Sequence, residues 1–159
     1  MAADKYQKLN EKADIMYRFV SMYGDYMRMS HDYGTGEKIN MAEVHTLTFI
    51  ADNPGITITE IAGMWNKTKG AVSQIVTKLE AKGYIEKCKE GNNSKNLHCY
   101  ATESGQTLSD VHKRYDVEGL NRENQLLRKE FTDSELDAFY KVMERYTEIV
   151  LIPDIENKK

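Results

Sequence analysis

The chain has 159 residues, 40% of them apolar, and a formal net charge of −3, which fits one compact domain, alone or with an appended dimerisation module. No apolar run reaches the length of a membrane-spanning helix, and the charged N-terminal segment MAADKYQKLNEK is unlike a secretory signal. Two cysteines without such a signal favour the reducing cytoplasm over a disulfide framework, so we expect a cytoplasmic protein with no membrane partner.

The first predicted element is a long N-terminal helix, which ends before a flexible break at residues 34–36. A shorter helix follows at residues 39–52, with Asn40 and Glu43 as a predicted capping box. Along the first helix, apolar residues recur at alternating spacings of three and four, which is a heptad-like seam. The residues of this seam are Tyr6, Leu9, Ala13, Met16, Val20, Tyr23 and Met27.

Residues 56–82 predict two helices joined by a tight turn. Thr57 and Glu60 form a capping box for the first helix, and Thr68 is the predicted N-cap of the second, at about residues 68–82. The second helix has an apolar inward face and an outward face that is small or hydrogen-bonding, which suits contact with bases and phosphates, although a merely solvated polar face is the alternative. The inward face is Ala71, Val72, Ile75, Val76 and Leu79, and the predicted DNA-binding residues are Thr68, Lys69, Gly70, Ser73, Gln74, Thr77 and Lys78.

A β-hairpin is predicted at residues 84–102, with a polar tip at 91–96. A helix-turn-helix followed by a hairpin is a winged helix, whose second helix enters the major groove of double-stranded DNA. Lys87, Lys89 and Lys95 would lie along this wing, on the DNA backbone or in the minor groove, although a solvated hairpin explains the tip equally well.

Charge is distributed in the way that a DNA-binding segment requires. Between Thr57 and Thr102 there are seven lysines and four acids, a net charge of +3, so the rest of the chain carries −6. The local field, rather than the total charge, governs attraction to phosphate. The same segment has no arginine, so it cannot make the commonest contact to guanine, a pair of hydrogen bonds from one arginine side chain.

Two helices complete the chain, one from Glu103 to about Lys129 and one opened by a capping box of Thr132 and Glu135. The last helix carries a second apolar seam, so we expect a homodimer, with packing inside one chain as the alternative. The predicted fold class is mainly α with a small β wing: a winged helix-turn-helix flanked by long N- and C-terminal dimerisation helices. Its parts are a dimerisation helix at 1–38, a DNA-binding domain at 39–102 and dimerisation helices at 103–159, and the last seam is Leu136, Phe139, Met143, Tyr146 and Val150.

The segment ITITEIAGMWNKTKGAVSQIVTKLEAKGYIEK resembles the MarR family of winged-helix transcriptional regulators. The resemblance implies a dimer whose first and last helices interlock, binding to a pseudo-palindromic operator, and repression. The family wing usually reads D-x-R-x-x-x-V-x-L-T, but Asn93 and Lys95 stand here at the Asp and Arg positions, and lysine lacks the planar arginine fork. The alternative function is a winged helix that binds protein rather than DNA. No catalytic constellation appears, so we do not expect an enzyme.

Three kinds of effector remain open. Zinc-responsive MarR-like repressors have ligands at the positions of His45, His112 and Asp116, so the resemblance implies a zinc site there. Their acidic ligand on the first helix falls on Met27, with Asp25 or Asp32 as substitutes. The alternative is that His45 lies in the core and His112 at the surface.

The second effector is a small organic molecule in a cleft lined by Met16, Tyr17, Tyr23 and Met27, residues that suit the core equally well. The third is a redox switch between Cys88 and Cys99, which a turn centred near residue 93 would place opposite each other on the wing. Small buried apolar roles are the alternative for these cysteines.

Overall fold

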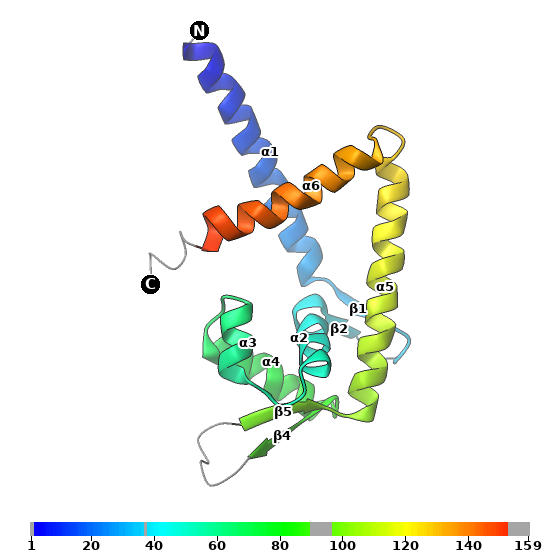
Figure 1. Ribbon diagram of the computed structural model, residues 1–159. Coiled ribbons are helices and arrows are strands. Elements are labelled where there is room, and N and C mark those ends of the chain that lie inside the picture. The colour runs from blue at the N-terminus through cyan, green and yellow to red at the C-terminus, as the bar shows by residue number, and fades with distance from the viewer. Residues whose placement is uncertain (1, 37, 90–96, 153–159) are drawn as a thin grey trace. The chain divides into compact units, whose positions relative to one another are not determined.

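Helices dominate the chain, and the strands form two small antiparallel sheets (Figure 1). The computed structural model describes residues 2–36, 38–89 and 97–152. The predicted mainly α class with a small β wing is confirmed. In chain order the elements are α1 (Ala2–Arg28), β1 (Ser30–Asp32), β2 (Lys38–Asn40), α2 (Met41–Asp52), β3 (Ile56–Thr57), α3 (Ile58–Met64), α4 (Lys69–Ala81), β4 (Ile85–Lys89), β5 (Leu97–Ala101), α5 (Glu103–Leu127), α6 (Asp133–Tyr146) and a π-helical turn, Thr147–Leu151.

The chain divides into two compact units, residues 1–114 and 115–159. The boundary falls within α5, so the second unit holds the end of that helix together with α6. Among the described residues, no helix combines the length and the apolar character that crossing a membrane requires.

The core of the first unit lies among α2, α3, α4 and the start of α5. Each fully buried aliphatic side chain there contributes about 1.5–3 kcal/mol relative to an exposed one. Ala71 is an exception to the predicted inward face of α4, because it is exposed in the first turn of the helix. The fully buried aliphatic residues of these helices are Val44, Leu47, Ile50, Ile61, Val72, Val76, Leu79 and Leu108.

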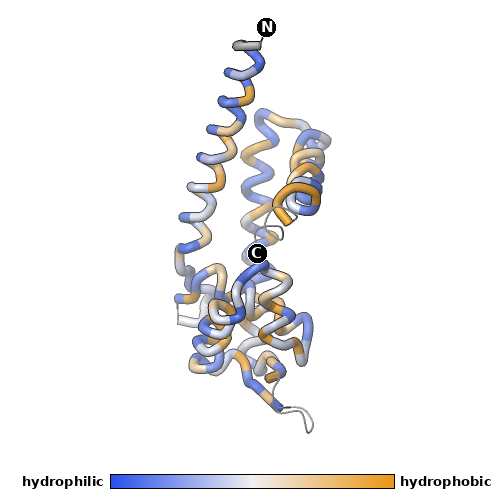
Figure 2. Tube along the Cα trace, turned by 90° about the vertical axis from the view of Figure 1, so that its left-hand side faces the viewer, coloured by the Kyte–Doolittle hydropathy of each residue, from blue (hydrophilic) through white to orange (hydrophobic). Residues whose placement is uncertain are grey.

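The long helix α1 keeps most of its predicted seam at the surface. Apolar and polar residues alternate along its whole length (Figure 2). Of the seam residues, Tyr6, Leu9, Met16, Val20 and Tyr23 are exposed large hydrophobic side chains.

The helix α1 ends before residues 34–36, as predicted, and the segment that follows it forms a hydrogen-bonded turn. β1 and β2 pair antiparallel, with His31 opposite Ile39. The Asp32 Oδ1 atom accepts hydrogen bonds from the backbone N–H groups of Gly34, Thr35 and Gly36, at 2.8, 3.1 and 3.2 Å. A glycine-rich sequence is compatible with such a turn because glycine adopts positive φ without steric cost, as Gly34 does here at +88°.

Helix capping follows local sequence rules at two of the three predicted boxes. The boxes of Thr57 with Glu60 and of Thr132 with Glu135 are both complete. Hydrogen bonds from Thr57 hold the pKa of Glu60 below its ordinary value. At α2 only half of the box forms: Asn40 accepts from the Glu43 backbone N–H at 2.9 Å, but the Glu43 carboxylate pairs with lysines of α4.

The wing is a three-stranded sheet of order β3-β5-β4. Its register places Lys87 opposite Cys99 and His98 opposite Cys88. The predicted Cys88–Cys99 pairing is therefore wrong, because residues offset by one position project from opposite faces of a hairpin. Cys88 is exposed and Cys99 is buried, and burial raises the pKa of the Cys99 thiol. These positions support the small buried role for Cys99 and give no support to a cross-strand redox switch.

The second unit is built on α6 and the end of α5. The Tyr140 hydroxyl donates to the Asn124 side-chain oxygen at 3.1 Å, and Arg128 pairs with Asp133 at 2.5 Å. Of the predicted seam on α6, Leu136 is buried, whereas Phe139, Met143 and Tyr146 are exposed.

Candidate nucleic-acid interface

The helix-turn-helix consists of α3, a four-residue turn and α4. The turn contains Asn66 at a φ of +49°, a left-handed conformation that asparagine tolerates better than most residues. Thr68 then caps α4, as predicted, by accepting from the Ala71 backbone N–H at 3.2 Å. The turn and the cap together set where the outward face of α4 begins.

The outward face of α4 is polar and open to solvent along the helix. A side chain added at Gly70 would meet no other atom within 4 Å, so this position leaves room for a close approach to the helix. Ser73 is half-buried between the two faces. The remaining predicted DNA-binding residues of this face are all exposed, namely Thr68, Lys69, Gln74, Thr77 and Lys78.

Two lysines at the end of α4 converge on one carboxylate of α2. Glu43 is only 5% exposed, and its oxygens lie 3.4 Å from Lys78 Nζ and 3.6 Å from Lys82 Nζ. Lys82 Nζ also donates to the Lys38 backbone carbonyl at 3.3 Å. Our sequence reasoning missed this ion pair. An acidic residue between the apolar positions Met41, Val44 and Leu47 of this helix was a signal that could have revealed it, because buried carboxylates require a partner.

The wing contributes fewer free charges than predicted. Lys87 has a side chain only 19% exposed, and it pairs with Glu80 at 2.5 Å. This pairing removes Lys87 from the lysines predicted to contact the DNA backbone, whereas Lys89 is exposed. Asn93 and Lys95, the two wing residues of the predicted DNA-binding set, lie outside the described residues.

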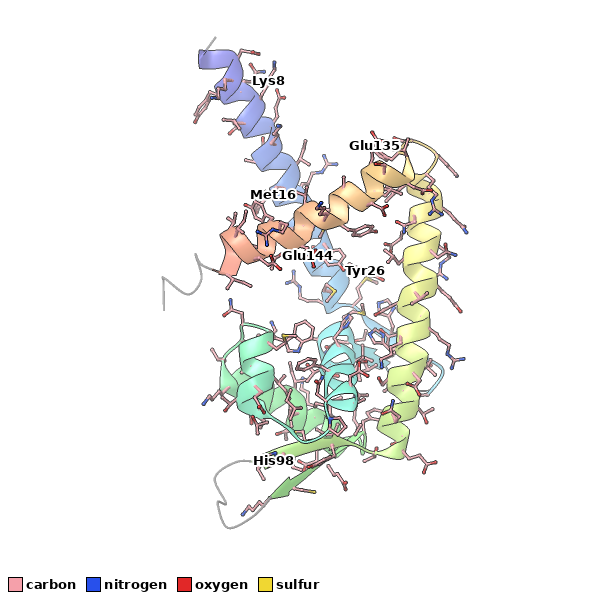
Figure 3. All side chains as sticks on the ribbon, viewed as in Figure 1. Lys8, Met16, Tyr26, His98, Glu135 and Glu144 are labelled. Carbon is pink, nitrogen blue, oxygen red and sulfur yellow. The ribbon has the colours of Figure 1, made fainter. Side chains whose placement is uncertain are left out.

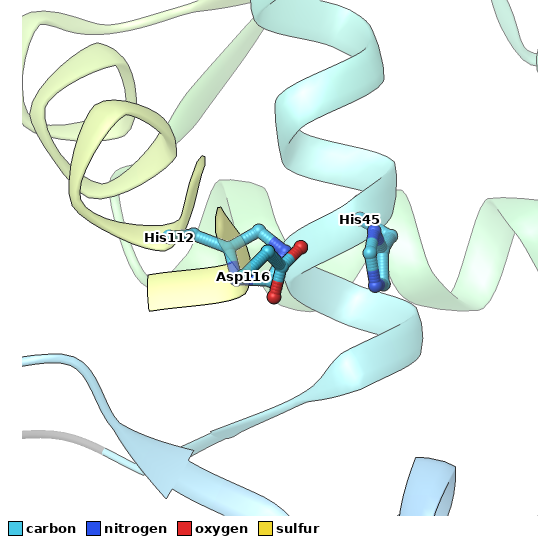
Figure 4. A group of neighbouring side chains, drawn as sticks. All are labelled: His45, His112 and Asp116. Carbon is cyan, nitrogen blue, oxygen red and sulfur yellow. The ribbon is translucent and has the colours of Figure 1, made fainter. Parts of the chain in front are cut away.

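The three predicted metal-ligating residues come together (Figure 4). His45 lies on α2, and His112 and Asp116 lie one turn apart on α5, with one potential ligand atom from each within 4.8 Å of the others. The two imidazole rings are 4.7 Å apart, edge to face. His112 is 1% exposed, so the alternative expectation of a surface position for it is wrong.

Aromatic rings surround this histidine pair. Tyr33 lies edge-on to His112 with ring centroids 5.1 Å apart, and Trp65 lies 6.5 Å from His45. Nitrogen and carboxylate donors in this number fit a zinc site with three protein ligands. Of the predicted acidic substitutes, Asp25 pairs with Arg28 and Asp32 closes the β1–β2 turn.

The residues predicted to bind an organic effector lie mostly at the surface of the described part of the chain. Met16, labelled on α1 in Figure 3, is exposed, as are Tyr17 and Tyr23, while Met27 is half-buried. They do not belong to the core. A shallow pocket of the first unit is lined by other residues, including Tyr33, Tyr84, Leu108 and Val111.

Comparison with known proteins agrees with this geometry. Residues 38–94 match the sequence model of the MarR family. An uncharacterized HTH-type transcriptional regulator of Bacillus subtilis, YhjH, is 33% identical over 88 residues, which are 55% of this chain and 50% of YhjH. The matched segment therefore spans about half the length of that curated relative.

Two solved structures share the fold. Streptococcus pneumoniae FabT, crystallised in complex with DNA, is 22% identical with a TM-score of 0.64, and the match covers 97% of this chain and 99% of FabT. Lactococcus lactis ZitR, a zinc-responsive MarR family member, is 18% identical with a TM-score of 0.65, over 87% of this chain and 96% of ZitR. With residues 38–94 matched by the family model and the fold shared by FabT and ZitR, the winged helix-turn-helix of this chain is similar to that of the MarR family.

Proposed function

We propose that the protein is a homodimeric, sequence-specific DNA-binding repressor that acts in the cytoplasm on a pseudo-palindromic operator. The observation that carries the proposal is α4, whose apolar face is buried while its polar face is exposed in a helix-turn-helix. Its N-terminal residues Lys69 and Gly70, with Gln74, would face the major groove. In this account residues 39–102 bind DNA, and residues 1–38 and 103–159 form the dimer.

The dimer is supported by the exposed seams. α1 exposes Tyr6, Leu9 and Val20 at seam positions, and α6 exposes Phe139 and Met143. A large exposed apolar surface of this kind marks an interaction site in a water-soluble protein. Two copies joined by a two-fold axis would present two α4 helices about one DNA turn apart.

The experiment is a binding titration on purified full-length protein with operator and random duplexes, combined with analytical ultracentrifugation of the complex. The proposal predicts one dimer per operator and a preference for operator over random duplex of at least about 10³-fold. A monomer that occupies a half-site with full affinity would refute the dimeric part. Equal affinity for both duplexes would refute sequence-specific binding.

For the effector we propose zinc, bound by His45, His112 and Asp116 and acting as a co-repressor. The convergence of these side chains supports the proposal, as does the description of ZitR as zinc-responsive. Bound zinc would supply a bond between α2 and α5. His112 suits the task because packing already holds its ring near His45. A ligand favours one conformation only by the difference between its affinities for the two.

The zinc proposal is tested by titrating operator affinity against buffered free zinc. Wild type should bind operator more tightly as zinc rises, and His112→Ala should respond little. His98→Ala is the matched control, because His98 lies outside the cluster and contacts the Gly55 carbonyl at 2.7 Å. A flat response in wild type, with release of DNA by a phenolic compound, would favour the organic effector.

A further inference from the structure

Among the described residues, Glu43 is a buried carboxylate that lies against two lysines at the C-terminal end of α4. It belongs to α2, and its partners are Lys78, in the last turn of α4, and Lys82, the C-cap residue that follows the helix. A carboxylate that is 5% exposed is costly to bury unless it is paired, and the two lysines supply that pairing.

The two lysines differ in what else they can do. Lys82 has a side chain only 29% exposed and a second partner, the Lys38 carbonyl, which holds it against the protein. Lys78 has a side chain 64% exposed and lies on the polar face of α4, beside Thr77. Lys78 can therefore reach either Glu43 or a phosphate in front of the helix.

We propose that Glu43 limits the sequence-independent part of DNA binding by competing with phosphate for Lys78 and, to a lesser degree, Lys82. The inference rests on the proposed DNA-binding function. Glu43 with its two lysines carries a net charge of +1, where the lysines alone would carry +2. Because phosphate neutralisation governs non-specific affinity, the pairing weakens binding to every sequence and leaves base contacts as a larger share of the total.

The size of the effect follows from counterion release. For double-stranded DNA, log Kobs falls with log[salt] by about 0.9 for each neutralised phosphate. Glu43→Gln adds one positive charge per protomer, so the slope should steepen by about 0.9 per protomer and about 1.8 per dimer. Affinity for a random duplex should rise by roughly tenfold or more at low salt, and affinity for operator should rise by the same factor.

The experiment measures random-duplex and operator affinity between 50 and 300 mM salt, by fluorescence anisotropy on the full chain. Glu118→Gln is the matched control, because it removes the same charge from an exposed position on α5 without touching either lysine. The slope should steepen in Glu43→Gln and stay within error of wild type in Glu118→Gln. Adding Lys78→Ala to Glu43→Gln should abolish most of the gain.

A purely structural role for Glu43 would lower the melting temperature without steepening the slope, and that result would overturn the inference. So would a gain that survives when Lys78 and Lys82 are both alanine. If Glu43→Gln does not fold, single lysine variants decide the matter. Lys78→Ala should then reduce the wild-type salt slope by less than half as much as Lys69→Ala, and equal reductions would overturn the inference. Absence of DNA binding by wild type would instead refute the proposed function itself.

Discussion

Substitution of Gly105 tests how closely the start of α5 packs against the Tyr84 backbone of the winged helix. A Cβ atom added there would lie 1.9 Å from the Tyr84 carbonyl oxygen and 3.2 Å from Leu47 Cδ1. The oxygen belongs to the backbone, and it also accepts a hydrogen bond from the Thr102 N–H at 3.0 Å. It cannot move aside by changing a rotamer, so α5 itself would have to shift.

The expected cost of Gly105→Ala follows from two opposing effects. Overpacking a core costs about 1–3 kcal/mol, and a fixed backbone neighbour places this site at the upper end of that range. Alanine in place of glycine in a helix gains about 1 kcal/mol. We therefore expect a net loss of about 2 kcal/mol, which for a chain of this size lowers Tm by roughly 4–8 °C.

Urea denaturation monitored by circular dichroism measures this loss. Gly119→Ala, on the same helix, is the control, because its added Cβ would have as its nearest neighbour the Arg122 Nη2 atom at 3.8 Å. It should stabilise the protein by about 0.4–1 kcal/mol. If Gly105→Ala were as stable as wild type, the close seating of α5 on Tyr84 would be wrong.

Four further substitutions test the recognition helix and the caps of α3 and α4. Gln74→Ala should cost about 1–3 kcal/mol of binding free energy for the preferred operator and relax discrimination at one or two base pairs. Lys69→Ala should weaken binding to all sequences alike and reduce the salt slope by about 1 per protomer. Titrating both variants against altered operators separates the two effects. Thr68→Ala should cost about 1 kcal/mol in urea denaturation, because it removes the N-cap of α4, and an unchanged midpoint would contradict the cap. Glu60→Gln should lower Tm at pH 7, and the difference in Tm from wild type should disappear in melts at lower pH. Hydrogen bonds from Thr57 depress the pKa of Glu60 in the folded protein. The stabilisation by Glu60 is therefore present above the ordinary pKa of 4.5 and is lost as the pH falls through the folded pKa.

Local patterns predicted the helix-turn-helix well because its determinants lie within a few residues of one another. The Thr57–Glu60 box and the Thr68 cap depend on a spacing of three residues, and both form. The burial of Val72, Val76 and Leu79 follows from helical periodicity. Each of these features would be present in any fold that kept the two helices.

Features that depend on packing between distant segments were not predicted. Glu43 looked like half of a capping box, because its lysine partners lie 35 and 39 residues further along the chain. The burial of His112 arises only when α5 packs beside α2 and Tyr33. The predicted pairing of Cys88 with Cys99 was wrong for a related reason, since a shift of one residue in register moves a side chain to the other face of the hairpin.

An in vitro selection measures whether α4 recognises a specific DNA sequence. Purified protein is incubated with a random pool of duplexes, and the bound fraction is amplified and sequenced over several rounds, for wild type and for Gln74→Ala. We expect wild type to enrich a pseudo-palindrome whose half-sites are centred about one helical turn apart. We expect Gln74→Ala to lose base preference at one or two symmetry-related positions of that sequence. A wild-type pool with no enriched sequence, or the same motif in both pools, would contradict these expectations.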